Sequence, residues 1–93
     1  MPYIKPERRK ELDDGVFRLA TDLHGSGNDK GDLNYVITSL IHYHLKHVGI
    51  RYSTLSDITG VLNDVKVEFE RRIVAPYEDK KIAENGNIKI LEG

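Results

Sequence analysis

Two segments of the chain repeat apolar residues at the spacing of one helix face, and this pattern restricts the fold more than any other feature. The first stripe consists of Leu33, Val36, Ile37, Leu40, Ile41, His44 and Val48, and the second of Leu55, Ile58, Leu62, Val65 and Phe69. Two long amphipathic helices joined by a short turn bury their stripes against each other. The two segments are therefore predicted to form a long antiparallel helical hairpin.

The limits of these two helices are predicted from residues with special backbone preferences. Asp32 is expected to cap the first of them and Gly49 to end it. The next helix opens at residues 52–53. Pro76 is expected to break it, because proline disfavours helical geometry at the preceding residue, Ala75.

Shorter elements flank the hairpin. An N-terminal helix is expected to begin at Pro6, to kink or restart at Gly15, and to lead into a flexible connection at residues 24–31. Its stripe consists of Leu12, Val16, Leu19, Ala20 and Leu23. A short helix is expected at residues 78–84, closed by Asn85 and Gly86 and followed by an extended tail. The fold class is thus all-α, with residues 1–93 forming one helical domain.

The amount of apolar helix surface predicts self-association. A chain of 93 residues buries a modest core, and small domains often gain burial by assembling. Two long helices and a partial third leave part of their apolar surface uncovered. The protein is therefore expected to be a homo-oligomer.

Charge and composition exclude several classes of partner. The formal net charge is -1, whereas proteins that bind nucleic acid polymers usually carry a basic stripe. The sequence has no cysteine, which excludes disulfides and thiolate chemistry, and no apolar run long enough to cross a bilayer. We expect a cytoplasmic protein that binds neither membranes nor nucleic acid polymers.

A polar corner is predicted where the chain would turn at Pro76. Arginine binds phosphate through its guanidinium fork, tyrosine stacks on rings, and asparagine can recognise a ring edge. The candidate ligand-binding residues there are Arg71, Arg72, Tyr77, Lys80 and Asn85, with Asp79 and Lys81 beside them. The same residues are equally typical of a bundle end covered by surface ion pairs.

Two further clusters have a similar character. Lys5, Arg8 and Arg9 lie near a helix start, where free N–H groups and cations suit a phosphate or carboxylate. Asn34 and Tyr35 lie near the start of the next helix, where they could bind an aromatic ring and its polar edge. The alternatives are a frayed, charged terminus for the first cluster and surface packing beside a cap for the second.

Metal binding is not expected from the spacing of the histidines and acids. Only His44 and His47 share a helix face, and a zinc site needs three or four converging ligands. A line of acids at Asp57, Asp64 and Glu68, with Glu7, Glu11 and Asp14 as a possible second line, would suit magnesium. A solvated face with ion pairs is the favoured explanation of these acids.

Three segments resemble a small helical family of uncharacterised proteins common in bacteriophages and bacteria. They are MPYIKPERR at residues 1–9, GDLNY at residues 31–35, and VAPYEDKKI at residues 74–82 with ENG at residues 84–86. The resemblance covers nearly the whole chain, and residues 88–93 depart from it. It implies a phage or bacterial cytoplasm. Small oligomeric phage proteins of this size include sponges that sequester nucleotide immune signals, an analogy of size and style.

The first functional hypothesis is therefore a non-enzymatic binding protein for an anionic nucleotide, such as a cyclic nucleotide or an ADP-ribose derivative, acting against host defence. No cofactor is expected. A second hypothesis is a magnesium-dependent nucleotide hydrolase that uses the acidic line. A third is a structural or adaptor module that binds another protein through its uncovered helix faces.

Overall fold

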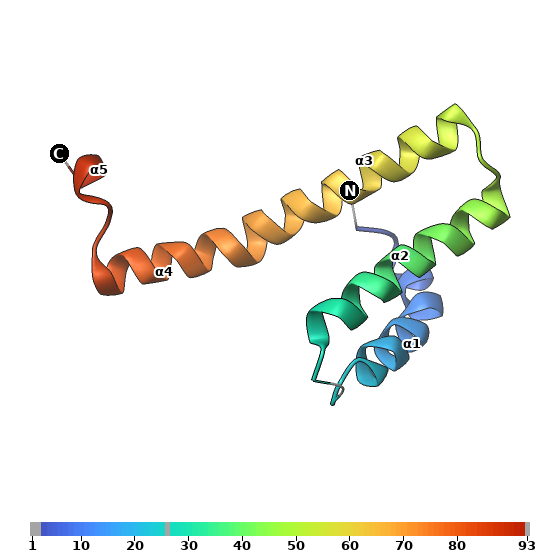
Figure 1. Cartoon of the computed structure of the whole chain (residues 1–93), viewed down its shortest axis with the longest axis horizontal. Helices are drawn as coiled ribbons and strands as arrows, with labels where there is room; N and C mark the ends of the chain where they lie inside the picture. The colour runs from blue at the N-terminus through green and yellow to red at the C-terminus, as the bar shows by residue number, and fades with distance from the viewer. Residues whose placement is uncertain (1–2, 26, 93) are drawn as a thin grey trace. The chain divides into compact units, whose positions relative to one another are not determined.

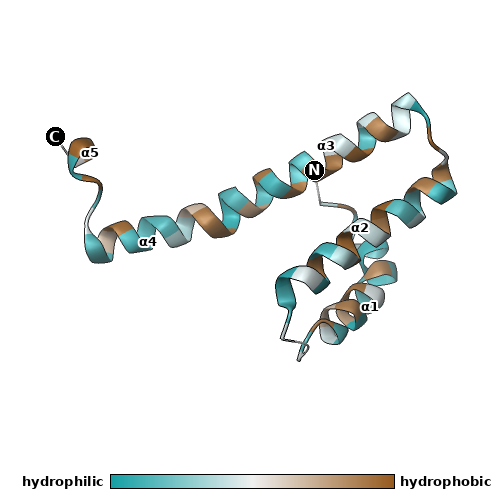
Figure 2. Cartoon of the chain, viewed as in Figure 1, coloured by the Kyte–Doolittle hydropathy of each residue, from teal (hydrophilic) through white to brown (hydrophobic). Residues whose placement is uncertain are grey.

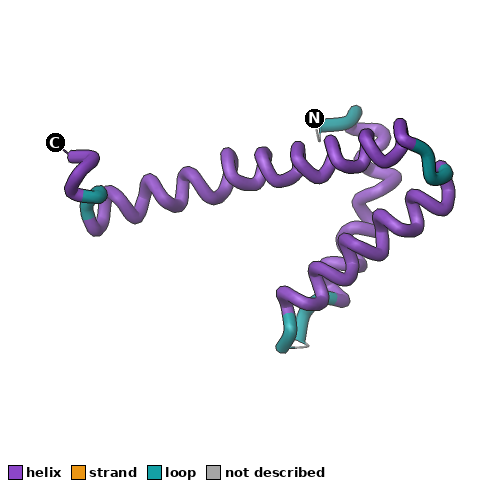
Figure 3. The backbone as a smooth tube through the Cα atoms, turned by 45° about the horizontal axis from the view of Figure 1, so that its top comes forward, coloured by secondary structure: helices purple, strands orange, loops and turns teal. Residues whose placement is uncertain are grey.

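The computed structural model describes residues 3–25 and 27–92, and these residues form helices joined by short connections, with no strand among them (Figures 1 and 3). The helices are α1 (Pro6–Asp22), α2 (Asp29–Val48), α3 (Tyr52–Phe69), a π turn η1 (Glu70–Val74), α4 (Ala75–Asn85) and α5 (Lys89–Glu92). The prediction of an all-α fold is confirmed. Met1, Pro2, Ser26 and Gly93, which belong to the first motif, the flexible connection and the tail, lie outside the described residues.

The first two helices differ from prediction mainly at their ends. α1 begins at Pro6, as predicted, and continues through Gly15 without a restart. α2 begins at Asp29, with Asn28 at the N-cap position, so the prediction that Asp32 caps it is wrong. Asparagine and aspartate are about equally favoured at N-cap positions, and the helix begins after the earlier one, although the Asn28 side chain forms no capping hydrogen bond. One extra turn of helix follows, and it brings Lys30 and Gly31 into α2.

A tight polar connection joins α2 to α3. Gly49 ends α2 as predicted, with a positive φ of 89° and its N–H donating to the Leu45 carbonyl at 2.7 Å. The hydroxyl of Thr54 accepts from the Arg51 N–H at 3.0 Å and lies 2.7 Å from the Gly49 carbonyl, to which it can donate. Only 8% of the surface of Thr54 is exposed, so this polar residue is buried. Packing of α2 against α3 as a hairpin remains a prediction.

The helix does not break at Pro76, so that prediction is wrong. α3 passes through the π turn into α4, and Ala75 has helical angles, φ −62° and ψ −46°. The Ala75 N–H donates to the carbonyl of Glu70, five residues back. Proline lacks an N–H, and its ring clashes with the carbonyl four residues earlier in an α-helix. The wider π turn before Pro76 lets the chain continue, and α4 then ends at Asn85 with Gly86 as its cap, as predicted.

The tail also differs from prediction. Residues 89–92 form the single helical turn α5 in place of the predicted extended tail. The side-chain oxygen of Asn87 accepts from the Ile88 N–H at 2.7 Å, and the Leu91 N–H donates to the Ile88 carbonyl at 2.9 Å. These local bonds stabilise a turn where a lone strand would have no partner.

The chain divides into two compact units after Ile58, and each is described by itself. Whether they act as the one predicted domain stays a prediction. Among the described residues, no apolar side chain is buried in either unit. Figure 2 shows apolar and polar residues interspersed along the helices, and most of the large apolar side chains are exposed while others, such as Val36 and Ile41, are half-buried. No described helix is both long and apolar enough to span a membrane.

Candidate functional site

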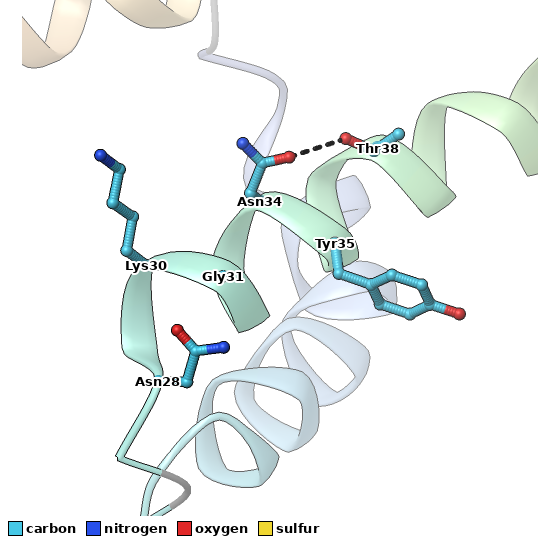
Figure 4. A pocket seen from close by; sticks show the side chains of 6 residues that line it. All are labelled: Asn28, Lys30, Gly31, Asn34, Tyr35 and Thr38. Carbon is cyan, nitrogen blue, oxygen red and sulfur yellow. Dashed lines mark hydrogen bonds between the residues drawn. The ribbon is translucent and has the colours of Figure 1, made fainter.

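The first turns of α2 form a hollow of about 520 Å³. Figure 4 shows its lining, which comes from α2 and its cap: Asn28, Lys30, Gly31, Asn34, Tyr35 and Thr38. Two of these, Asn34 and Tyr35, are residues that the sequence marked for ring recognition. The volume falls within the range of about 300–1,000 Å³ that is typical of small-molecule sites. The hollow is therefore large enough for a nucleotide-sized ligand.

Gly31, which lines this hollow, leaves space for a neighbouring side chain. A Cβ atom added to Gly31 would lie 2.6 Å from Nδ2 and 2.9 Å from Oδ1 of Asn28. Real Cβ atoms essentially never approach other atoms so closely. The absence of a side chain at Gly31 thus lets the Asn28 amide lie against the first turn of the helix. Any larger residue at this position would displace that amide.

Side chains on the next turn offer a ring and a polar edge. Tyr35 is 73% exposed, so its ring face is available for stacking. The Thr38 hydroxyl donates to the Asn34 side-chain oxygen at 3.2 Å, which orients the Asn34 NH₂ group away from Thr38 (Figure 4). Neighbouring residues on a helix project about 100° apart, so Asn34 and Tyr35 offer an amide and a ring face to different parts of a ligand (Figure 4).

The charges around the hollow are mixed. The first N–H groups of a helix have no partner within it, and they carry the positive end of the helix dipole. Lys30 adds a positive charge, while Asp29 and Asp32 lie in the same turn. A bare inorganic anion would be repelled by these two carboxylates. The arrangement favours a ligand that combines an aromatic ring with phosphate.

The hollow has one wall within this chain, because its lining residues all belong to α2 and its cap. Small-molecule sites usually bury about 70–90% of their ligand. One helix surface cannot achieve this. A complete site therefore requires a second wall from another element.

The predicted N-terminal cluster is engaged with its own chain. Lys5 occupies the N-cap position of α1. Arg8 forms an ion pair with Glu11, and Nε of Arg9 donates to the Ile4 carbonyl at 2.8 Å. Both arginines would have to exchange these exposed contacts for ligand contacts, which costs little free energy. Their assignment as ligand-binding residues stays a prediction.

The predicted corner is not folded back on itself. Because the helix continues, Lys80 lies roughly 13 Å beyond Arg71 along the axis, at about 1.5 Å per residue, and Asn85 roughly 20 Å beyond it. The predicted turn, which would have brought Tyr77 and Lys80 back toward Arg71 and Arg72, does not form. Instead η1 and α4 make one continuous helical segment, called the rod below.

Local pairs along this rod explain much of its charge pattern. Nε of Arg72 lies 4.0 Å from Oε1 of Glu68, and Nζ of Lys81 lies 3.3 Å from Oε2 of Glu84. The same ammonium group lies 5.5 Å from the centre of the Tyr77 ring. Ligand binding by the residues of this segment stays a prediction. Within one chain, however, their side chains do not come together around one point.

No group of three histidine, cysteine, aspartate or glutamate side chains is placed to hold a metal ion within residues 3–25 and 27–92. Glu68 and Glu11 of the two acidic lines take part in ion pairs with Arg72 and Arg8. The acids Asp57, Asp64 and Glu68 all belong to α3, as predicted. A magnesium role for them stays a prediction.

A hollow of about 370 Å³ on α1 differs in charge from that on α2. It is lined by Asp14, Phe17, Arg18, Thr21 and Asp22. Its two carboxylates line the hollow itself, whereas Asp29 and Asp32 do not line the hollow on α2, so the hollow on α1 is less suitable for a phosphate.

Sequence reasoning missed part of the α2 hollow. Asn28, Lys30 and Gly31 were assigned to a flexible connection, and Thr38 was assigned no role. The available signal was the asparagine itself, a preferred N-cap residue four positions before the predicted cap. Starting the helix there would have placed Lys30 and Gly31 on the same turns as Asn34 and Tyr35.

Together the fold and the hollow define a small all-helical protein with exposed apolar helix faces and an open polar site on α2. A family described as a domain of unknown function, DUF6899, matches residues 1–88, and the chain belongs to this family. The match ends where residues 88–93 depart from the motifs of the resemblance drawn above. Neither the curated proteins nor the solved structures include a detectable match to this chain.

Proposed function

We propose that this protein is a non-enzymatic, homo-oligomeric binding protein that sequesters a small anionic nucleotide. The observation that carries the proposal is the hollow on α2, where an exposed tyrosine, two amides and a lysine surround the start of a helix. Tyr35 would stack on the base, Asn34 would bind a polar group elsewhere on the nucleotide, and Lys30 with the first N–H groups would bind phosphate. No step of this binding requires a catalytic group.

Oligomerisation is the second part of the proposal. Large apolar side chains such as Leu62 and Phe69 are 44% and 57% exposed within one chain. Burying a side chain of this kind from full exposure contributes about 1.5–3 kcal/mol, so these half-exposed side chains would each gain roughly half of that. A second copy would cover these faces and provide the second wall that the hollow lacks. The basic residues Arg8, Arg9 and Arg71 are candidates for phosphate contacts from such a copy.

A biological role follows from the resemblance to phage and bacterial proteins. The ligand would be a nucleotide immune signal, such as a cyclic nucleotide or an ADP-ribose derivative. The protein would then act by lowering its free concentration. Such a sponge needs tight binding and many sites, which a small symmetric oligomer supplies.

The test is a thermal-shift screen of the full chain against cyclic dinucleotides and ADP-ribose derivatives, with and without magnesium. A ligand at a hundred times its Kd stabilises the folded state by about 2.7 kcal/mol, which is readily measured. We expect a shift without turnover. Magnesium-dependent hydrolysis would instead identify the enzyme that the acidic line predicts.

The exposed apolar faces also favour a second candidate function, an adaptor that binds another protein through α3. No nucleotide in the screen would then change the melting temperature. A defined partner protein would bind the chain, and Phe69→Asp would abolish that binding. The two functions are thus separated by which ligand stabilises the folded chain.

A further inference from the structure

A second hollow continues the first along α2. It has a volume of about 270 Å³ and is lined by Tyr35, Ser39, His42, Tyr43 and Lys46. Tyr35 lines both hollows. By itself the second hollow is slightly smaller than a typical small-molecule site of about 300–1,000 Å³. It is better understood as an extension of the first.

The two hollows have matching chemistry. Each contains a tyrosine that is 73% exposed, Tyr35 in both and Tyr43 in the second. Each also contains a lysine at its outer end, Lys30 and Lys46. Hydrogen-bonding side chains lie between the lysines: Asn34 and Thr38 in the first hollow, Ser39 and His42 in the second. Each hollow on the polar face of α2 thus presents a tyrosine, a lysine and hydrogen-bonding side chains, and the first adds the N–H groups of the helix start.

The spacing of the two tyrosines restricts the ligand. Tyr35 and Tyr43 are eight positions apart on one α-helix, so they are separated by roughly 12 Å along its axis. Stacked bases of one strand are about 3.4 Å apart. Two bases bound by these tyrosines would therefore be splayed, one in each hollow, with the linking phosphate near Ser39 and His42.

We infer that the two hollows form one site for a dinucleotide, in which each base stacks on its own tyrosine. This inference rests on the proposed function and specifies its ligand class. It depends on the second hollow, which lies on the middle turns of α2 and is independent of the helix start. A ligand with one base would occupy the first hollow alone.

The test compares the linear diadenylate pApA with AMP and ADP-ribose, each of which has one base, by calorimetry on the full chain. The parent should bind pApA at least about tenfold more tightly than AMP, because a second stacked base adds to affinity. Tyr43→Ala should reduce pApA affinity to the AMP level and leave AMP binding unchanged. Tyr35→Ala should weaken both ligands.

Controls keep the outcomes separate. Tyr52→Ala removes an exposed tyrosine of α3 that lines neither hollow, and it should change neither titration. Lys46→Ala is a second probe of the extension if circular dichroism shows that Tyr43→Ala loses helix. Equal affinities for AMP and pApA, or pApA binding that withstands both changes, would overturn the inference while the proposed function stands. Failure of all three ligands to bind would overturn the inference, and the thermal-shift screen, which includes cyclic dinucleotides, would then decide the proposed function.

Discussion

The first turns of α2 and the segment from the π turn into α4 carry the same kinds of side chain in different backbone settings. At α2, Gly31 leaves room for the Asn28 amide, and the residues that follow line a hollow. Beyond the π turn, a continuous helix spreads Arg71, Tyr77 and Lys80 along a rod. Residue types indicate which ligand chemistry is available, whereas the backbone decides whether the groups converge.

The largest effect is expected from a change on the exposed apolar face of α3, through which a second copy is proposed to pack. Phe69→Asp places a charge where a second copy should pack, and burying an unpaired charge costs several kcal/mol. We expect light scattering to give the mass of one chain, 10.6 kDa, in place of a multiple of it. Helix content should also fall.

The matched control for this change is Asn63→Asp, which adds a charge to an exposed polar position on the same helix. It should leave the oligomer intact. If the parent protein is itself a single chain at micromolar concentration, then no second copy covers either region, and this part of the proposal is wrong.

A direct comparison of the two regions uses their tyrosines. Tyr35→Ala should weaken nucleotide binding roughly ten- to a hundredfold, because stacking on an aromatic ring contributes about 1–3 kcal/mol per base. Tyr77→Ala should change affinity by less than about twofold, since that ring lies on the rod beside Lys81. Calorimetry with the nucleotide found in the screen measures both. The reverse order of effects would locate the site at the π turn.

A smaller effect is expected at the connection between α2 and α3. Thr54→Val keeps the shape of the side chain but removes its bonds to Arg51 and Gly49, at a cost of about 1–3 kcal/mol. The melting temperature should fall by about 4–8 °C per kcal/mol for a domain of this size. Ser56→Ala on the same helix is the control. An unchanged melting temperature for Thr54→Val would mean that this connection does not limit stability.

The smallest effect is expected from the surface ion pair of the rod. Arg72→Ala removes the 4.0 Å contact with Glu68, which should change the free energy of unfolding by less than about 1 kcal/mol. Nucleotide affinity should also be nearly unchanged in low salt. A tenfold loss of affinity would instead show that Arg72 contacts phosphate, as the sequence predicted.

The helices could be predicted from the sequence because apolar spacing and end residues such as Gly49 and Gly86 act locally. The path at Pro76 could not, because the π turn depends on how the preceding carbonyls rearrange, and no residue type signals it. The tail was missed for a similar reason, since Asn87 forms its own local bond.

The candidate site was predicted in part. Asn34 and Tyr35 were identified from their chemistry, and they line the hollow. Asn28 and Lys30 were missed because the helix was started one turn late, at Asp32. The convergence of Arg71 with Lys80 was wrong because it depended on a turn that the backbone does not make.

The most direct test is a calorimetric titration of the nucleotide into the parent, Gly31→Ala and Gly15→Ala. Alanine is favoured over glycine inside a helix by about 0.8–1 kcal/mol, so neither change should lower helix content. At Gly15 a Cβ atom meets nothing within 4 Å, whereas at Gly31 it displaces the Asn28 amide. We predict that Gly31→Ala weakens binding at least about tenfold and that Gly15→Ala leaves it unchanged. Equal affinities for all three proteins would contradict a nucleotide bound against Gly31 and the Asn28 amide.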